Sequence, residues 1–170
     1  MNSHPGGEGH TRRMLELAAL PPGARILDMG AGAGETLRML RAHGFDAEGI
    51  DLRPRSGDVQ QGDFLRPSFP DGSFDAVISQ CAFFVSGDVP GALREAHRLL
   101  SPGGKLLLSD VFFEAPVPLL ELAGFSVTAA EDMTAAWRDY YLEALWREDA
   151  PCCALPGGKC AYWLLIAERR

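Results

Sequence analysis

The sequence predicts an α/β protein, in which a doubly wound and mostly parallel sheet carries helices on both faces. One observation is that short apolar runs alternate with segments whose apolar residues recur at helical spacing. Another is that the first apolar run ends in a glycine-rich turn, residues 28–34, which leads directly into a helical segment. The sequence shows neither internal repeats nor an interdomain linker, and 170 residues suit one domain with a core of its own.

The elements can be placed in order from these patterns. Strands are expected over residues 26–28, 45–51, 59–61, 76–79, 105–112, 125–129 and 161–167, and helices over residues 11–20, 36–42, 88–100, 116–123 and 134–147. Pro21 and Pro22 end the first helix. Asp88 is expected to cap the helix after the fourth strand, and Thr134 is expected to cap the last helix.

Composition narrows the function classes. The net charge of −7 repels phosphates, so a nucleic-acid partner is not expected. No segment is long and apolar enough to span a membrane, and the polar amino terminus differs from a signal peptide. Four cysteines in a chain of this size do not indicate a disulfide framework. We expect a cytoplasmic protein with a flexible leader over residues 1–10 and a single domain over residues 11–170.

The glycine turn indicates the ligand. Gly30, Gly32 and Gly34 alternate after Asp28, and Glu35 stands where a dinucleotide fingerprint would have its third glycine. This pattern resembles motif I of the class I methyltransferases, which bind S-adenosylmethionine (SAM). Two further stretches resemble the same family, F-D-x-V at residues 74–77 and L-x-P-G-G-x-L at residues 100–106. The resemblance covers residues 11–112 well, and beyond them only the order of elements matches.

The resemblance implies a Rossmann-like sheet of seven strands with an antiparallel last strand, and SAM as the cofactor. Asp51 lies 21 residues after Gly30, a spacing at which an acid can accept hydrogen bonds from ribose hydroxyls. The family's pattern implies that Asp63 accepts from the adenine amino group and that Phe64 packs on the ring. The expected cofactor-binding residues are Asp28, Gly30, Gly32, Gly34, Asp51, Leu52, Asp63, Phe64 and Gln80.

Three functions remain open. The first is methyl transfer to a small-molecule acceptor, most similar to the methyltransferases of quinone biosynthesis. The second is methylation of a soft element such as arsenic or selenium, held by the thiols of Cys152, Cys153 and Cys160. The third is a SAM-binding module without catalysis that serves a partner enzyme.

The catalytic residues are not specified by the sequence. The candidates for a general base are His10, His4 and Asp110, because methyl transfer needs a base only when the acceptor is protonated. His4 and His10 reach the cofactor if the leader folds over the pocket, as it often does in the family. The sequence has no C-x-x-C spacing and no other metal constellation, so no metal site is expected. The compact chain indicates a small acceptor or a lid supplied by the second subunit of a homodimer.

Overall fold

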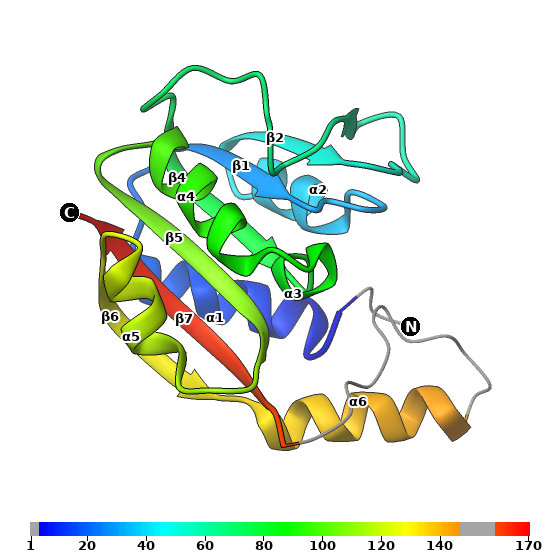
Figure 1. Ribbon diagram of the computed structural model, residues 1–170. Helices are drawn as coiled ribbons and strands as arrows, with labels where there is room; N and C mark the ends of the chain where they lie inside the picture. Colours follow the sequence, from blue (N-terminus) through cyan, green and yellow to red (C-terminus); the bar gives the residue numbers. More distant parts are fainter. Residues whose placement is uncertain (1–3, 147–158) are drawn as a thin grey trace.

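The computed structural model describes residues 4–146 and 159–170, and it confirms the expected α/β class. Seven strands form one sheet in the order β3-β2-β1-β4-β5-β7-β6 (Figure 1). The strands are β1 (Arg25–Met29), β2 (Asp46–Asp51), β3 (Gln60–Gln61), β4 (Phe74–Gln80), β5 (Leu100–Phe112), β6 (Phe125–Asp132) and β7 (Ala161–Arg169). Strand β7 runs antiparallel to both β5 and β6, whereas the other neighbours are parallel.

Helices cover both faces of the sheet (Figure 1). They are α1 (Gly7–Ala18), α2 (Glu35–Ala42), α3 (Phe83–Ser86), α4 (Val89–Leu99), α5 (Pro116–Leu122) and α6 (Thr134–Trp146). Successive strand residues point to opposite faces, so each strand supplies two clusters. Ile26 belongs to the buried cluster of α1 and α2 with Met14 and Leu37. Its neighbour Leu27 belongs to the opposite cluster, which contains Leu93 of α4.

Helix α1 begins at Gly7, earlier than the expected start at residue 11. Residues 7–10, which were expected in the leader, form the first turn of this helix. His4 and His10 are both buried. Gly6 explains how the segment turns back, because its φ of 73° is left-handed and it has no side chain. A Cβ at Gly6 would lie 2.1 Å from the ring of His10, so the histidine can pack there only against glycine.

Local hydrogen bonds set the other element ends. Asp88 caps α4 as expected, because its carboxylate accepts the N–H of Gly91 at 2.8 Å. Thr134 is not a cap, since it is the first residue of α6 and donates its own N–H to Asp132 Oδ1 at 2.9 Å. Strand β5 begins at Leu100, before the expected residue 105, because Leu100 pairs with Phe74 ahead of a register shift.

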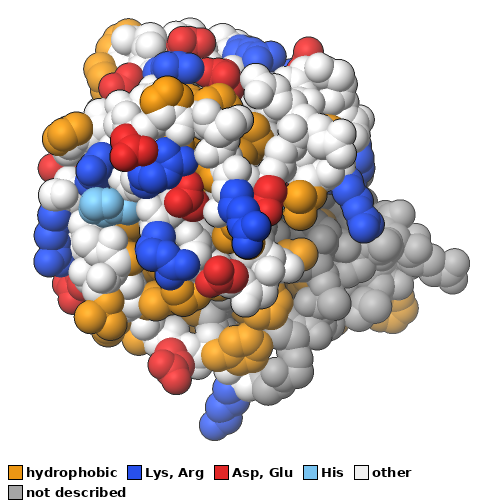
Figure 2. Space-filling view, turned by 45° about the horizontal axis from the view of Figure 1, so that its top comes forward, with side chains coloured by type: hydrophobic (Ala, Val, Ile, Leu, Met, Phe, Trp, Pro, Cys, Tyr) orange, Lys and Arg blue, Asp and Glu red, His pale blue; other side chains and the backbone are white. Residues whose placement is uncertain are grey.

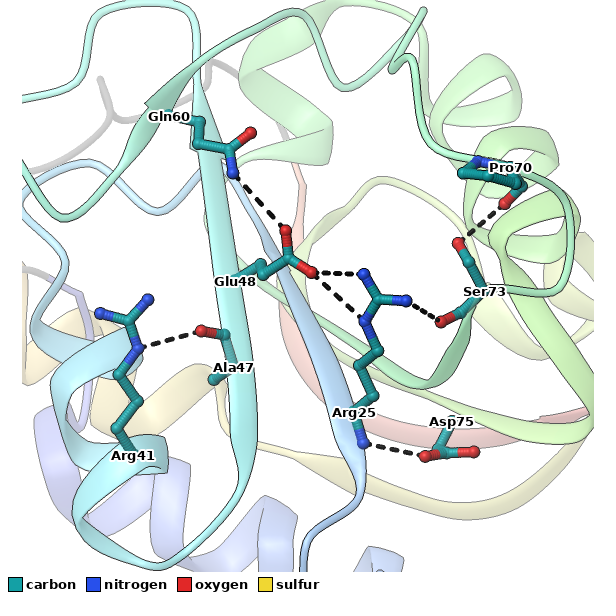
Figure 3. Close-up of polar contacts among 8 residues, drawn as sticks. All are labelled: Arg25, Arg41, Ala47, Glu48, Gln60, Pro70, Ser73 and Asp75. Atoms are coloured by element: carbon teal, nitrogen blue, oxygen red, sulfur yellow. Dashed lines mark hydrogen bonds and ion pairs between the residues drawn. The ribbon is translucent and has the colours of Figure 1, made fainter.

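Arg25 fastens the start of β1 to its neighbours on both sides (Figure 3). Its backbone N–H donates to Asp75 at 2.8 Å, and its guanidinium pairs with Glu48 of β2 at 2.6 Å. The same guanidinium lies 4.8 Å from the centre of the Phe74 ring. These contacts hold the amino ends of β1, β2 and β4 in register, so the opposite, carboxyl ends of the same strands are also aligned.

The surface carries charges of both signs. On the face seen in Figure 2, Lys and Arg side chains lie interspersed with Asp and Glu side chains. Opposite charges at the surface pair, as Arg13 does with Glu131 at 2.6 Å. Among the helices of the described ranges, none combines the length and the apolar character needed to cross a bilayer.

Candidate functional site

A cavity of about 480 Å³ opens at the carboxyl ends of β1, β2 and β4. The strand order reverses at β1, which is where open α/β sheets bind ligands. The volume is typical of small-molecule sites. Eight of the nine residues expected to bind cofactor lie on its wall: Asp28, Gly30, Gly32, Asp51, Leu52, Asp63, Phe64 and Gln80. The ninth, Gly34, is not on the wall and forms the amino-terminal cap of α2 instead.

The glycine loop requires glycine at two wall positions. Gly30 and Gly32 have φ angles of 89° and 51°, in the left-handed region. A Cβ at Gly30 would lie 2.3 Å from the Cβ of Ala82. The loop can approach the segment after β4 this closely only because Gly30 has no side chain. The N–H groups of Gly30 and Ala31 both donate to the carbonyl of Ile50, at 2.9 and 3.0 Å. The loop is thereby fixed between the ends of β2 and β4.

Asp28 is the buried carboxyl group at the base of this loop. Its side chain is 3% exposed, and Oδ2 has no hydrogen-bond partner among the residues that the structure describes. Burial, and then the neighbouring charge of Asp51, raises the pKa of Asp28 to about 7. A buried oxygen without a donor is unfavourable in the free protein. The site is therefore prepared for a ligand that brings a hydrogen-bond donor, preferably a cationic one, to Asp28.

Asp51 ends β2 and connects two loops at the cavity. Its Oδ2 accepts the N–H of Gly32 at 2.9 Å, and its Oδ1 accepts the N–H of Arg53 at 2.8 Å. The backbone N–H of Arg55 donates to the carbonyl of Gly32 at 2.9 Å. The neighbouring Leu52 is 59% exposed at the rim. Asp51 lies on the cavity wall, and each of its carboxylate oxygens can accept a further hydrogen bond, as the binding of ribose hydroxyls requires.

Asp63 and Phe64 form the next section of the wall. Asp63 Oδ1 accepts the N–H of Leu65 at 2.8 Å, which fixes the turn after β3. Phe64 is buried, and its ring centre lies 5.7 Å from that of Phe83 in α3. An acceptor beside a fixed aromatic ring suits a heteroaromatic base with an exocyclic amino group.

Gln80 links four segments at the end of β4. Its Oε1 accepts from the hydroxyls of Thr36 and Thr11, at 2.9 and 3.3 Å. Its Nε2 lies 3.4 Å from Nδ1 of His4, which is also on the cavity wall. Helix α1 and the residues before it are therefore attached to the start of α2 through one side chain.

The two leading base candidates, His10 and Asp110, are not on the cavity wall. The carboxylate of Asp110 accepts from the backbone N–H groups of Phe84 and Val111, at 3.1 and 2.8 Å. His10 packs on Gly6 as described above. His4 does line the cavity, and burial lowers its pKa from the usual value, so its imidazole is neutral at neutral pH.

Cys81 is on the wall beside Gln80, with its sulfur 3.2 Å from the hydroxyl of Tyr162. Its φ of 56° is unusual for a residue with a side chain. Cys160 packs against the same aromatic cluster, whereas Cys152 and Cys153 lie outside the described residues. Within residues 4–146 and 159–170, no three His, Cys, Asp or Glu side chains are grouped to hold a metal.

Three further wall residues were not expected from the sequence. Arg53 and Arg55 come from the segment after β2, and Val85 comes from the segment after β4. Their position shortly after a strand's carboxyl end was the available signal. Their side-chain types give no further indication, because valine and arginine occur throughout the chain.

The fold is a Rossmann-like α/β sheet with a ligand cavity at the carboxyl ends of its strands. Sequence comparison identifies the family. The family described as "Methyltransferase domain" matches residues 9–163. The chain therefore belongs to this methyltransferase family, as the resemblance in motif I indicated.

Individual relatives cover parts of the chain. Demethylmenaquinone methyltransferase of Thermus thermophilus is 37% identical over 58% of this chain and 52% of its own length. Phosphoethanolamine N-methyltransferase 3 of Arabidopsis thaliana is 26% identical over 84% of this chain and 36% of its own length. The chain thus spans about a third to a half of the curated relatives that it matches.

Solved structures share the fold. Phosphoethanolamine N-methyltransferase 2 of Haemonchus contortus, in complex with S-adenosyl-L-methionine, superposes with a TM-score of 0.78 at 18% identity, over 98% of this chain and 53% of that one. The cyclase SpnF superposes with a TM-score of 0.70 at 20% identity, over 94% of this chain and 79% of that one. Because SpnF is named a cyclase, this fold is not confined to methyl transfer, and the function must be argued from the site.

Proposed function

We propose that the chain binds SAM in the cavity at β1, β2 and β4 and transfers its methyl group to a small-molecule acceptor. The observation that carries this proposal is Asp28, which lies on the wall of the same cavity as the glycine loop and whose Oδ2 has no hydrogen-bond partner among the described residues. In the proposed complex Asp28 accepts from the ammonium group of the cofactor. Asp51 accepts from the ribose hydroxyls, and Asp63 with Phe64 holds the adenine.

In methyl transfer from SAM the main task of the protein is to position the acceptor and the cofactor. SAM, when bound, supplies a methyl group on a sulfonium, which is already a good leaving group. The residues of the chain hold the acceptor in line with that methyl group and exclude water. His4 is the candidate base that lines the cavity, and its neutral imidazole can take a proton from an acidic acceptor.

Calorimetry with S-adenosylhomocysteine (SAH), SAM and NAD tests the ligand. We expect SAM and SAH to bind and NAD to bind far more weakly, because Glu35 occupies the position of the third dinucleotide glycine. Tighter binding of NAD would refute the assignment. Transfer of labelled methyl from SAM to a panel of acceptors then tests catalysis.

A soft-element acceptor is the second candidate, and the observation that favours it is the thiol of Cys81 on the cavity wall. An arsenite methyltransferase is also among the relatives, 33% identical over 58% of this chain. A Cys152→Ser, Cys153→Ser double variant should keep its SAH affinity. Loss of arsenite-dependent turnover in that variant would favour this candidate, and unchanged turnover would favour the first.

The third reading, a SAM-binding module without catalysis, predicts SAH binding with no turnover on any acceptor tested alone. Turnover that appears only after a partner protein is added would support it. The expected cytoplasmic location, the expected lack of a nucleic-acid partner and a homodimer stay proposals. The net charge of −7 supports the second of these, because nucleic-acid binding uses a basic stripe.

A further inference from the structure

A second hollow of about 480 Å³ lies beside the proposed cofactor cavity, on the other side of α3. Its walls come from α3, the start of α4, the end of β5 and α5. In Figure 1, α3 and the turn between β5 and α5 lie at the same end of the sheet. The lining is apolar except for Glu114, whereas carboxylates and arginines line the first cavity. We call this hollow the β5–α5 groove.

The groove and the cofactor cavity meet at α3. Val85 is on the wall of the cavity and 60% exposed, and its neighbour Phe84 is on the wall of the groove. The ring centre of Phe84 lies 5.8 Å from that of Phe113, which also lines the groove. Apolar side chains thus continue from the rim of the cofactor cavity across α3 and into the groove.

Two large apolar side chains that line the groove are exposed to solvent. Leu122 is 88% exposed and Phe113 is 52% exposed, and both line the groove. Leu120, on the same short helix as Leu122, is fully buried in the core, so the helix has an inner and an outer apolar side. Contiguous exposed apolar surface of this kind marks a binding site.

We propose that the β5–α5 groove binds the apolar chain of an amphiphilic acceptor, whose reacting end lies over α3 at the cofactor cavity. This inference rests on the proposed function. The occupant is argued from two features of the groove. It lies next to the proposed reaction site across α3, and its lining is apolar except for Glu114. Concave, mostly apolar hollows are typical of small-molecule sites, whereas a second copy of the chain would need a broad contact of roughly 800 Å² on each partner.

Straight-chain alcohols from butanol to decanol provide the probe, measured by calorimetry on the full chain with SAH present. Affinity should rise about fourfold for each added methylene, the gain expected for burying one methylene in an apolar site. Leu122→Asp should weaken decanol binding by roughly tenfold or more, because it brings a charge into the groove. The matched control is Leu142→Asp on α6, a leucine that is 54% exposed and outside the groove. It should bind decanol as the wild type does.

Several results would overturn the inference. Affinity that does not depend on chain length would do so, as would equal weakening by Leu122→Asp and Leu142→Asp. If sedimentation shows that Leu122→Asp converts a dimer to a monomer while decanol binding is unchanged, the inference is wrong and the groove is an interface between copies. Failure of SAH itself to bind, in the arm without alcohol, would overturn the proposed function. Circular dichroism confirms that each variant is folded, and Leu122→Asp should keep the wild-type SAH affinity.

Discussion

Asp28 is the residue whose protonation should control ligand binding. Its pKa of about 7 means that the carboxyl is mostly protonated at pH 6 and mostly ionised at pH 8. A cationic ligand group favours the ionised form, so SAH affinity should rise by about tenfold between those pH values. Asp28→Asn should bind SAH weakly at every pH, without that rise. The exposed Asp58→Asn is the matched control and should keep the wild-type profile, and calorimetry at each pH measures all three proteins.

The same carboxyl should affect the stability of the free protein in the opposite direction. Its pKa is raised from 3.8 when unfolded to about 7 when folded, so its contribution is fully present below the lower value. That contribution is lost as the pH rises through about 7. Relative to Asp28→Asn, the free energy of unfolding of the wild type should fall by up to roughly 4 kcal/mol between these limits. Urea denaturation without ligand measures this, and a constant difference across the range would contradict it.

Gly30 and Gly32 should respond differently to substitution. A Cβ at Gly32 would meet only the flexible end of Arg55, at 2.8 Å, whereas a Cβ at Gly30 would meet Ala82 at 2.3 Å. We expect Gly32→Val to stay folded and lose SAH binding, because its side chain enters the cavity. Gly30→Ala should lower the free energy of unfolding by about 1–3 kcal/mol. Gly57→Ala, with nothing within 4 Å, should change neither property. A Gly32→Val protein that is folded and still binds SAH would show that the loop is not the ligand site.

At the scale of elements, helix α1 should depend on its attachment to Gln80. The hydroxyl of Thr11 lies 3.3 Å from Gln80 Oε1 and 3.4 Å from the carbonyl of Gly7. Thr11→Val removes these bonds with little change of shape and should cost about 1–2 kcal/mol of stability. Amide hydrogen exchange should then increase in α1 more than elsewhere.

The control for this element is Thr128→Val on β6, which removes a bond of 3.2 Å to the carbonyl of Ile166. It should leave exchange in α1 unchanged. Equal exchange in α1 for the two variants would mean that the Gln80 contacts do not hold the helix. Because the same contacts reach His4 on the cavity wall, Thr11→Val should also weaken SAH binding.

At the scale of the whole molecule, ligand binding should stabilise the domain against unfolding. At a concentration 100 times its dissociation constant, SAH should add about 2.7 kcal/mol to the free energy of unfolding. In a domain of 170 residues this corresponds to a rise in Tm of roughly 5–10 °C. NAD at the same concentration should cause no rise. A thermal scan with each ligand measures this, and an equal shift for both would contradict the proposed specificity.

Most of the strands and helices, and most of the residues that line the cavity, could be predicted from the sequence. The strand-to-helix turn at residues 28–34, the acid at Asp51 and the turn at Asp63 are local features, because each lies at or just after the end of a strand. Parallel strands bring their carboxyl ends to one edge of the sheet, so local features there must meet. This is why eight of the nine expected residues line one cavity.

The catalytic candidates were predicted less well, because their places depend on contacts between distant segments. His10 follows the chain into α1 and packs on Gly6, whereas His4 reaches Gln80, far along the chain. Asp110 lies near the end of the fifth strand as expected, but its carboxylate accepts a hydrogen bond from the backbone of α3, a short helix that the sequence did not indicate. Periodicity cannot distinguish such helices of four residues from loops.

The sequence by itself determined the α/β class, the glycine loop and the carboxylates at or near the ends of β1, β2 and β3, because hydrophobic period and turn chemistry act over a few residues. Only the tertiary structure decided which residue faces the cavity at each edge, and that Asp28 keeps an oxygen without a partner there. It also decided that α3 and α5 leave the apolar β5–α5 groove beside the reaction site. Burial and cavity shape depend on how distant segments pack together, and local patterns do not contain that information.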